Sequence, residues 1–210
     1  MTANSPRSRP SLKAGTEPFH AEGQPIGPTV LDYWRWSASD LLSNTQRGVL
    51  AEYLVAAALG TVVRPRDEWA SFDVVNQDGD EIEVKSAAYR QSWAQDRPSA
   101  IQFRIAPIRW WWNPETNEYR ELDPPRRSAK IHVFCVLGRK TDLNPDPLDV
   151  SQWQFYVLPT AVLNREVPQQ KTISLGPLEA MVQRTTGRGA VGYESLRRVI
   201  DSILPSVKRR

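Results

Sequence analysis

Polar and apolar residues alternate along residues 71–85 in the way that predicts two short strands joined by a turn. The apolar positions of these strands are Phe72, Val74, Ile82 and Val84. The register of a hairpin decides which side chains share a face, because a slip of one residue turns every side chain over. A three-residue loop over residues 78–80 places Asp73 opposite Lys85 and separates the polar from the apolar side chains. We therefore predict Asp73, Glu83 and Lys85 on one face of a hairpin that is apolar on its other face.

The Ala- and Leu-rich residues 47–60 precede this hairpin, and their apolar side chains recur at helical spacing. Gly60 is a typical helix stop. Past its first residue the segment contains one charged side chain, Glu52, and a carboxylate among apolar groups needs a partner or a shifted pKa. A helix packed across the hairpin would bring Glu52 toward Asp73 and Glu83. The simpler alternative is a glutamate that faces solvent at the polar edge of the helix.

The rest of the pattern predicts a mixed central sheet flanked by helices. Residues 131–137 are nearly all apolar, which is typical of a central strand buried on both faces, with His132 as a hydrogen-bonded core histidine. Further strands are predicted at residues 61–63, 101–105 and 153–158, and further helices at residues 159–163, 177–181 and 193–204. We predict a single α/β (α+β) domain over residues 29–210, after a disordered Pro-, Ser- and Arg-rich tail over residues 1–28.

Composition narrows the class of protein. The chain has 210 residues, of which 40% are hydrophobic and 24% are charged, as in a globular domain with a real core. Its net charge of +3 is compatible with a nucleic-acid partner. The single cysteine, Cys135, excludes an internal disulfide and indicates a reducing compartment. No apolar run has membrane-spanning length and no signal peptide is visible, so we expect a cytoplasmic protein with no membrane partner.

Two carboxylates and an amine on one sheet face make a plausible site for a hard divalent cation. Sites that act on phosphates usually hold Mg²⁺ by one or two carboxylates, with water and substrate as the other ligands. The Lys85 ammonium would meet a phosphate oxygen or help to deprotonate a water. The alternative is a surface hairpin on which Asp73, Glu83 and Lys85 form an exposed ion pair of little energetic value.

The order of these residues resembles the PD-(D/E)XK nuclease superfamily, which has a helical Glu, an Asp on one strand and Glu-x-Lys on the next. The matching residues are Asp73 followed by Glu83-Val84-Lys85, together with Arg47-Gly48-x-x-Ala51-Glu52. The second group is similar to the opening helix of the archaeal Holliday-junction-resolvase branch. The resemblance covers Arg47 to about Ser86, and Phe72 stands where the family name has Pro.

The resemblance implies a restriction-endonuclease-like core and a metal-dependent nuclease that hydrolyses DNA phosphodiester bonds, leaving 5′-phosphate and 3′-hydroxyl ends. By that resemblance Asp73, Glu83 and the carbonyl of Val84 hold Mg²⁺, with Mn²⁺ as a substitute. Lys85 orients or deprotonates the attacking water, and Glu52 completes or extends the metal shell. RNA stays open as a substrate, and a non-catalytic nucleic-acid-binding module that retains the fold is the alternative function.

Five further residues are candidate nucleic-acid contacts: Arg64, Arg66, Gln91, Arg184 and Arg188. We place Arg184 and Arg188 in a flexible basic loop; ordinary surface arginines and a turn glutamine are the alternative. The three adjacent tryptophans Trp110–Trp112 begin an aromatic hairpin and cannot all point inward from a strand. At least one is therefore exposed or covered, first by the chain itself and otherwise by nucleic acid or a second copy in a homodimer.

Overall fold

The computed structural model describes residues 10–68, 70–113 and 118–208. Its helices are α1 (Val30–Ala38), α2 (Asn44–Leu59), α3 (Thr160–Glu166), α4 (Leu175–Thr186) and α5 (Tyr193–Lys208). Its first strands are β1 (Pro18–Ala21), β2 (Gln24–Thr29), β3 (Val74–Val75), β4 (Glu81–Ala88) and β5 (Gln102–Arg104). The later strands are β6 (Ile108–Asn113), β7 (Glu118–Arg126), β8 (Ile131–Leu137), β9 (Trp153–Pro159) and β10 (Thr172–Ser174).

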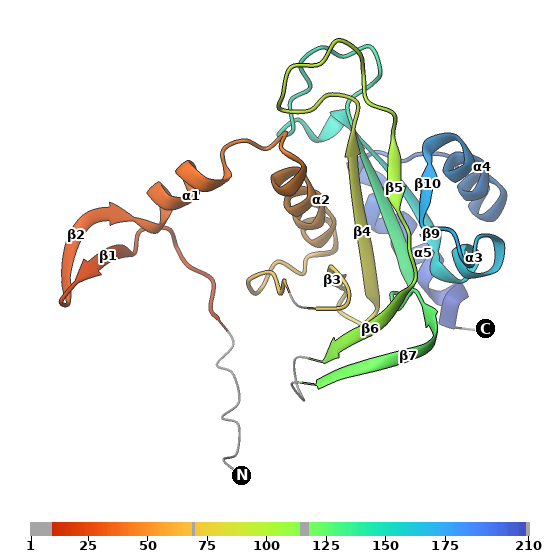
Figure 1. Cartoon of the computed structure of the whole chain (residues 1–210), viewed down its shortest axis with the longest axis horizontal. Coiled ribbons are helices and arrows are strands. Elements are labelled where there is room, and N and C mark those ends of the chain that lie inside the picture. Colours follow the sequence, from red (N-terminus) through yellow and green to blue (C-terminus); the bar gives the residue numbers. More distant parts are fainter. Residues whose placement is uncertain (1–9, 69, 114–117, 209–210) are drawn as a thin grey trace.

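A four-stranded mixed sheet in the order β3-β4-β8-β9 forms the centre of the domain (Figure 1). Strand β4 runs parallel to β8, whereas the pairs β3–β4 and β8–β9 are antiparallel. Every residue of β8 is buried, as predicted for a strand with neighbours on both edges and cover on both faces. The expectation of a mixed α/β domain with a central sheet and flanking helices is therefore confirmed.

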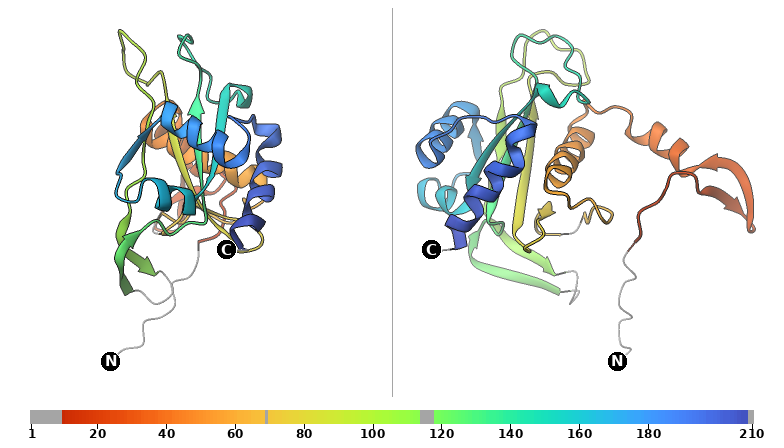
Figure 2. Two further views of the ribbon diagram at one scale, coloured as in Figure 1. Left: turned by 90° about the vertical axis from the view of Figure 1, so that its right-hand side faces the viewer. Right: turned by 180° about the vertical axis from the view of Figure 1, so that it is seen from behind.

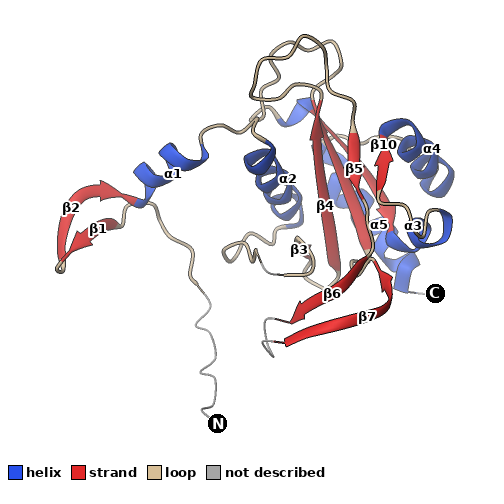
Figure 3. Ribbon diagram, viewed as in Figure 1, coloured by secondary structure: helices blue, strands red, loops and turns tan. Residues whose placement is uncertain are grey.

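Two separate cores cover the two faces of this sheet. Helices α2 and α5 pack on one face, where Leu54 and Ile200 belong to the same core as Ile82 and Val84 of β4. Strands β5 and β10 and helices α3 and α4 cover the other face, around Phe134 of β8. The views in Figures 2 and 3 show the resulting layers, with α2 and α4 on opposite sides of the sheet. None of the helices in the described ranges is long and apolar enough to cross a membrane.

Local signals in the sequence explain the bounds of α2. The side chain of Ser43 caps its first turn by accepting a hydrogen bond from the backbone N–H of Gln46 (3.3 Å). Gly60 ends the helix in the left-handed conformation (φ 71°) that glycine adopts without a steric penalty, and its N–H bonds back to the last turn. The predicted helix stop is confirmed, and the helix begins three residues before the predicted start.

The register of β3 against β4 differs from the predicted one by two residues. Val74 pairs with Ile82, so that continuation of the pairing places Asp73 opposite Glu83 and not opposite Lys85. A shift of two residues keeps each side chain on its predicted face, because side chains alternate with a period of two. The separation of apolar from polar side chains is therefore retained although the predicted register is wrong.

The loop between these strands explains the shift. The side-chain oxygen of Asn76 accepts hydrogen bonds from the backbone N–H of Asp78 (3.0 Å) and of Asp80 (2.8 Å), which widens the turn. Asp80 is completely buried and forms an ion pair with Lys130, the residue before β8. The predicted three-residue loop ended at Asp80, and the burial of Asp80 anchors the longer observed loop to the sheet.

Two other segments, residues 18–29 and residues 61–63, differ from the sequence-based expectation. Residues 18–29 form the β1–β2 hairpin where a disordered tail was predicted, and the described part of the tail begins at residue 10. A capping box between Thr29 and Asp32 then starts α1, a helix with no buried residue that projects away from the sheet (Figure 1). Residues 61–63 are not a strand, because they turn away after the bond from Thr61 N–H to Ala56 O (2.9 Å).

Candidate active site

Asp73 is held against the edge of β4 by two hydrogen bonds. Its backbone N–H donates to the carbonyl of Ile82 (3.1 Å), and its Oδ2 accepts from the backbone N–H of Val84 (2.7 Å). The carboxylate thus takes a position on the β4 edge that a strand carbonyl of β3 would otherwise fill. Because the N–H and C=O of a strand residue point to the same edge, the Val84 carbonyl faces the edge that Asp73 occupies.

Glu83 and Lys85 lie two residues apart on β4 and form an ion pair. Both side chains are largely buried, with 28% of the Lys85 side chain and 22% of the Glu83 side chain accessible to solvent. They share the strand face of Ala87, which belongs to the second core, while Ile82 and Val84 face α2. The prediction that Glu83 and Lys85 share one face is confirmed, and the pair is more buried than the surface alternative requires.

Glu52 approaches from α2 and is held by an arginine from the loop that follows the helix. Arg66 donates to both oxygens of the Glu52 carboxylate, with Nη2 at 3.0 Å from Oε1. This is the bidentate geometry that guanidinium groups favour with carboxylates. The solvent-facing alternative for Glu52 is wrong, since only 13% of its side chain is exposed. Arg66, predicted as a phosphate contact, is the partner that the lone helical carboxylate required.

The four predicted residues act on one another electrostatically. Burial raises the pKa of Glu83, the Lys85 ammonium opposes this, and the charges of Asp73 and Glu52 raise the pKa further. Burial acts to lower the pKa of Lys85, but the carboxylates of Glu83, Asp73 and Glu52 outweigh it and raise the pKa above its usual value. Burial also raises the pKa of Glu52, against the hydrogen bonds from Arg66 and with the charge of Asp73. The structure therefore brings Glu52, Asp73, Glu83 and Lys85 within electrostatic reach of one another.

The donor set fits a hard cation in kind but offers few ligands. Among the described residues, no three His, Cys, Asp or Glu side chains are grouped closely enough to hold a metal ion. Glu52 is engaged by Arg66, which leaves the oxygens of Asp73, Glu83 and Val84 as the predicted ligands. Two carboxylates with water and substrate are a sufficient set for Mg²⁺. These residues therefore fit a two-carboxylate site, and Glu52 lies outside it in the observed arrangement.

Comparison with known proteins leaves the chain without an assigned family. No protein-family model matches it, and no curated protein matches it. The functional assignment therefore depends on the residues and their geometry.

The predicted nucleic-acid contacts do not gather at one place. Arg64 lies exposed in the loop between α2 and β3, close in sequence to Arg66. Gln91 lies in the turn after β4, where its amide accepts from Arg47 Nη1 (2.8 Å) and donates to Ala88 O (3.0 Å). For Arg64 and Gln91, contact with nucleic acid stays a prediction.

The basic loop predicted around residue 184 needs a correction. Arg184 lies inside α4, which continues to Thr186, and it pairs with Glu166 at the end of α3 (2.9 Å). Arg188 is exposed just after this helix. Helix α4 lies on the other side of the sheet from α2, the helix that contains Glu52 (Figures 1 and 2).

The tryptophan-rich segment forms the predicted hairpin, the antiparallel pair β6–β7. Trp110 is exposed, which is one of the two outcomes predicted for at least one of the three tryptophans. Trp111 lies under the guanidinium of Arg120, 5.9 Å from its ring centre. The side chain of Trp112 and the turn at residues 114–117 lie outside the described residues. Whether nucleic acid or a second copy covers this hairpin stays a prediction.

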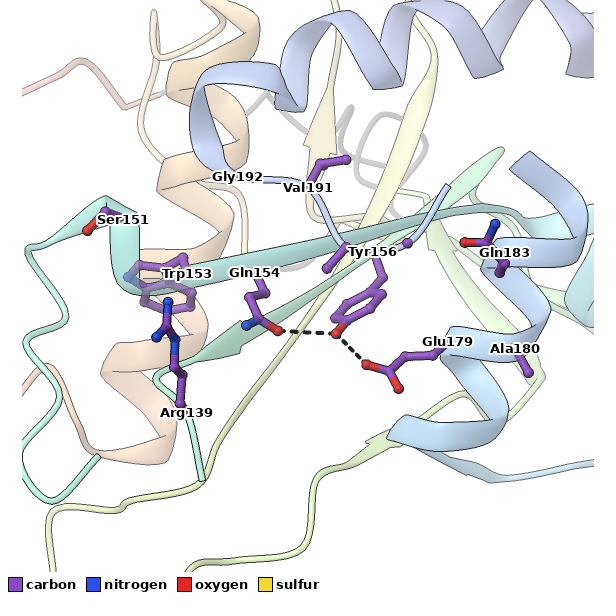
Figure 4. Close-up of a pocket in the computed structure, with 12 residues that line it drawn as sticks. Arg139, Ser151, Trp153, Gln154, Tyr156, Glu179, Ala180, Gln183, Val191 and Gly192 are labelled. Carbon is purple, nitrogen blue, oxygen red and sulfur yellow. Dashed lines mark hydrogen bonds between the residues drawn. The ribbon is translucent and has the colours of Figure 1, made fainter. Parts of the chain in front are cut away.

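A separate cavity of about 680 Å³ lies at the opposite edge of the sheet, over β9 (Figure 4). The hydroxyl of Tyr156 donates to Glu179 Oε1 at 2.7 Å within it, and Arg139 and Gln183 also line it. The cavity contains none of the predicted site residues. It therefore forms no part of the candidate active site.

Arg47 has no role of its own in the sequence-based prediction and is named there only as part of the resemblance to a family. This arginine is 4% exposed and bonds to Ser86, the residue after Lys85, through Nε (3.1 Å). One signal was present in the sequence: an arginine at the start of an otherwise apolar helix has no acidic residue three or four positions away.

Proposed function

We propose that the chain is a metal-dependent nuclease with a restriction-endonuclease-like core that hydrolyses phosphodiester bonds of DNA. The observation that supports this most is the electrostatic coupling between side chains of three different segments: Glu52 of α2, Asp73 just before β3, and Glu83 and Lys85 of β4. A merely structural ion pair needs two of these groups. Ionisable side chains whose pKa values are shifted by burial and by nearby charges, as those of Glu52, Glu83 and Lys85 are, cluster at functional sites.

In this function each side chain has a distinct role. Asp73 and Glu83, with the Val84 carbonyl, would hold Mg²⁺, which when bound supplies a Lewis acid and a water of lowered pKa. Asp73 is already oriented by the Val84 N–H. Water attacks phosphorus, the bond to the 3′ oxygen breaks, and that oxygen takes a proton, so the ends are a 5′-phosphate and a 3′-hydroxyl.

Lys85 acts in this scheme as a positive charge. Because its neighbours raise its pKa, the amine keeps its proton at neutral pH and attracts the phosphate oxygens on which negative charge develops. Its ion pair with Glu83 fixes its position before substrate arrives. Arg66 has a supporting role, since it orients Glu52 beside Asp73 and adds a second cation to the same edge.

The test is cleavage of a panel of duplex, single-stranded and branched DNA and of RNA, with Mg²⁺ and with chelator. We expect Mg²⁺-dependent cleavage of at least one DNA, and Lys85→Ala to reduce it by at least about 100-fold. Lys171→Ala is the matched control, because Lys171 is an exposed lysine before β10. Circular dichroism checks that both variants fold. Equal cleavage by the wild type and Lys85→Ala would refute the assignment.

One observation favours the second candidate, a nucleic-acid-binding module without catalysis. Arg66 engages both oxygens of Glu52 and Lys85 engages Glu83, so two of the three acidic groups have cationic partners within the chain. This function predicts DNA binding that neither chelator nor Asp73→Asn changes, and no cleavage of any substrate in the panel.

A further inference from the structure

Arg47 is buried in the first turns of α2 and makes four hydrogen bonds, all to neutral groups. Its Nε donates to Ser86 Oγ (3.1 Å), and its Nη1 donates to Leu42 O (3.1 Å) and to Gln91 Oε1 (2.8 Å). Its Nη2 donates to Asn44 Oδ1 (2.8 Å). The guanidinium is therefore well bonded, but none of these acceptors carries a negative charge.

The charge of Arg47 has no counter-charge among the residues that the structure describes. No ion pair joins it to an acidic side chain in those ranges, and burial lowers its pKa with no neighbouring carboxylate raising it. It is the fourth residue of α2, at the end of the helix where the dipole is positive and disfavours a cation. A buried charge in such a place is costly unless an anion comes to it.

The other buried arginine shows what a structural role requires. Arg127 is 6% exposed and also bonds to neutral oxygens, three of them backbone carbonyls. Two of these carbonyls, those of Val167 and Gln170, lie just past the end of α3, where the helix dipole is negative and favours a cation. Burial lowers the pKa of Arg127 as it lowers that of Arg47, so what separates the two is the helix end that each guanidinium faces, favourable for Arg127 and unfavourable for Arg47.

Arg47 lies beside the candidate active site. Its partner Ser86 follows Lys85 on β4, and Arg47 precedes Glu52 on α2 by five residues. The outer partners of the guanidinium are the exposed Asn44 and the half-buried Gln91. A methyl group added at the adjacent Gly48 would meet no atom within 4 Å, so there is open space beside this turn of the helix.

We propose that Arg47 is the counter-charge for a phosphate of the nucleic-acid substrate, which reaches it where Asn44 and Gln91 now bond. The proposal rests on the proposed function, because it takes the substrate of the neighbouring site to be a polyanion. The phosphate exchanges with neutral amide partners, so binding does not require a protein ion pair to break.

The substitution Asn44→Asp tests this assignment with little change of shape. An aspartate at this position keeps the acceptor for Arg47 Nη2 and supplies the missing charge from within the chain. It also places an acidic group in the first turn of α2, so we expect the unfolding midpoint to rise by roughly 1–4 °C. Thr45→Asp is the matched control, because Thr45 is exposed in the same turn and adds the same charge beside, but not on, the guanidinium.

Binding is measured by fluorescence anisotropy with a labelled DNA duplex and its labelled single strand, in an Asp73→Asn background with Mg²⁺ present. At about 0.1 M salt we expect Asn44→Asp to weaken binding by roughly 5- to 10-fold and Thr45→Asp to weaken it less. The slope of log K against log salt should become shallower by about one phosphate contact in Asn44→Asp alone.

Each outcome decides between the two claims. If Asn44→Asp is stabilised but binds DNA with the affinity and salt slope of Thr45→Asp, Arg47 is structural and the assignment fails, while the proposed nuclease function stands. If the parent protein binds no DNA, both the proposed function and the assignment of Arg47 are refuted. Arg47→Met tests the same assignment by removing the positive charge. If circular dichroism shows that this variant folds, its slope of log K against log salt should become shallower by the same amount as in Asn44→Asp.

Discussion

His132 offers a quantitative test of how the sheet beneath the candidate active site is built. It lies on β8 directly beside Glu83, is 3% exposed, and has its Nδ1 2.8 Å from Thr160 Oγ1. Burial lowers its pKa to about 3, and the positive charges of Lys85 and Arg127 add to the effect. The imidazole is therefore neutral in the folded protein at neutral and mildly acidic pH, so His132 adds no third cation beside Lys85 and Arg66.

The shift makes stability depend on pH with a definite sign. The pKa is depressed in the folded state, so the stabilisation is present above the unfolded pKa of about 6.5 and is lost as the pH falls toward 3. Between pH 7.5 and pH 5 the unfolded state takes up the proton and the folded state does not. The free energy of unfolding should fall by about 2 kcal/mol over that interval from this group alone. With a urea m-value of roughly 2–3 kcal/mol/M, the midpoint should fall by roughly 0.7–1 M.

Urea unfolding at several pH values, for the wild type and His132→Gln, measures this loss. The variant is expected to be less stable at pH 7.5, because it alters a buried hydrogen bond to Thr160. The decisive quantity is the fall in the free energy of unfolding between pH 7.5 and pH 5. This fall should be smaller in His132→Gln than in the wild type by about 2 kcal/mol. Other titrating groups, including Glu52 and Glu83 with their raised pKa values, contribute to both proteins and cancel in the difference.

Direct titration provides the control. The chain has two histidines, so His20→Gln leaves a single imidazole whose NMR signals should not shift between pH 8 and pH 5. In Lys85→Ala the same signals should begin to titrate at higher pH than in the parent, because one cation that opposes protonation is gone. Equal pH dependence of stability in the wild type and His132→Gln would refute the reasoning.

Two predictions concern the fold. Removal of residues 1–38 should leave the thermal midpoint of the remaining domain within about 2 °C of that of the full chain, because α1 has no buried residue. The contrary outcome is a lower midpoint after removal, together with a midpoint of the full chain that depends on protein concentration. It would indicate that residues 1–38 pack on a second copy. Lys130→Met should lower the free energy of unfolding by roughly 1–3 kcal/mol in urea titrations, because it removes the ion-pair partner of the fully buried Asp80. Lys171→Met, at an exposed lysine, is the matched control and should be neutral.

Structural features that depend mainly on the residues of one segment could be predicted from the sequence. The apolar run of β8 could only be satisfied by burial on both faces, and Gly60 had the one residue type that ends a helix in the left-handed conformation at low cost. The stripe of α5 that contains Leu196, Val199 and Ile200 is buried as its spacing required. In each case the local preference and the tertiary packing point the same way.

Features that depend on distant partners were not readable. The hairpin register was decided by Asn76 and by burial of Asp80 against Lys130, which lies fifty residues away in the chain. The identity of the Glu52 partner was also hidden, although the need for one was clear. Segments 18–29 form a hairpin by backbone pairing with mostly exposed side chains, so hydrophobic patterning gave no signal for it.

The balance of charge at the candidate site explains why a cation belongs to the proposed function. Glu52, Asp73 and Glu83 bring three negative charges, and Arg66 and Lys85 bring two positive ones, which leaves one excess negative charge. The raised pKa values of Glu52 and Glu83 reflect burial first and this crowding second. A phosphodiester also carries one negative charge, so these five groups alone would repel it. A divalent cation on Asp73 and Glu83 reverses the sign of the site, and substrate and cation are then expected to bind with positive coupling.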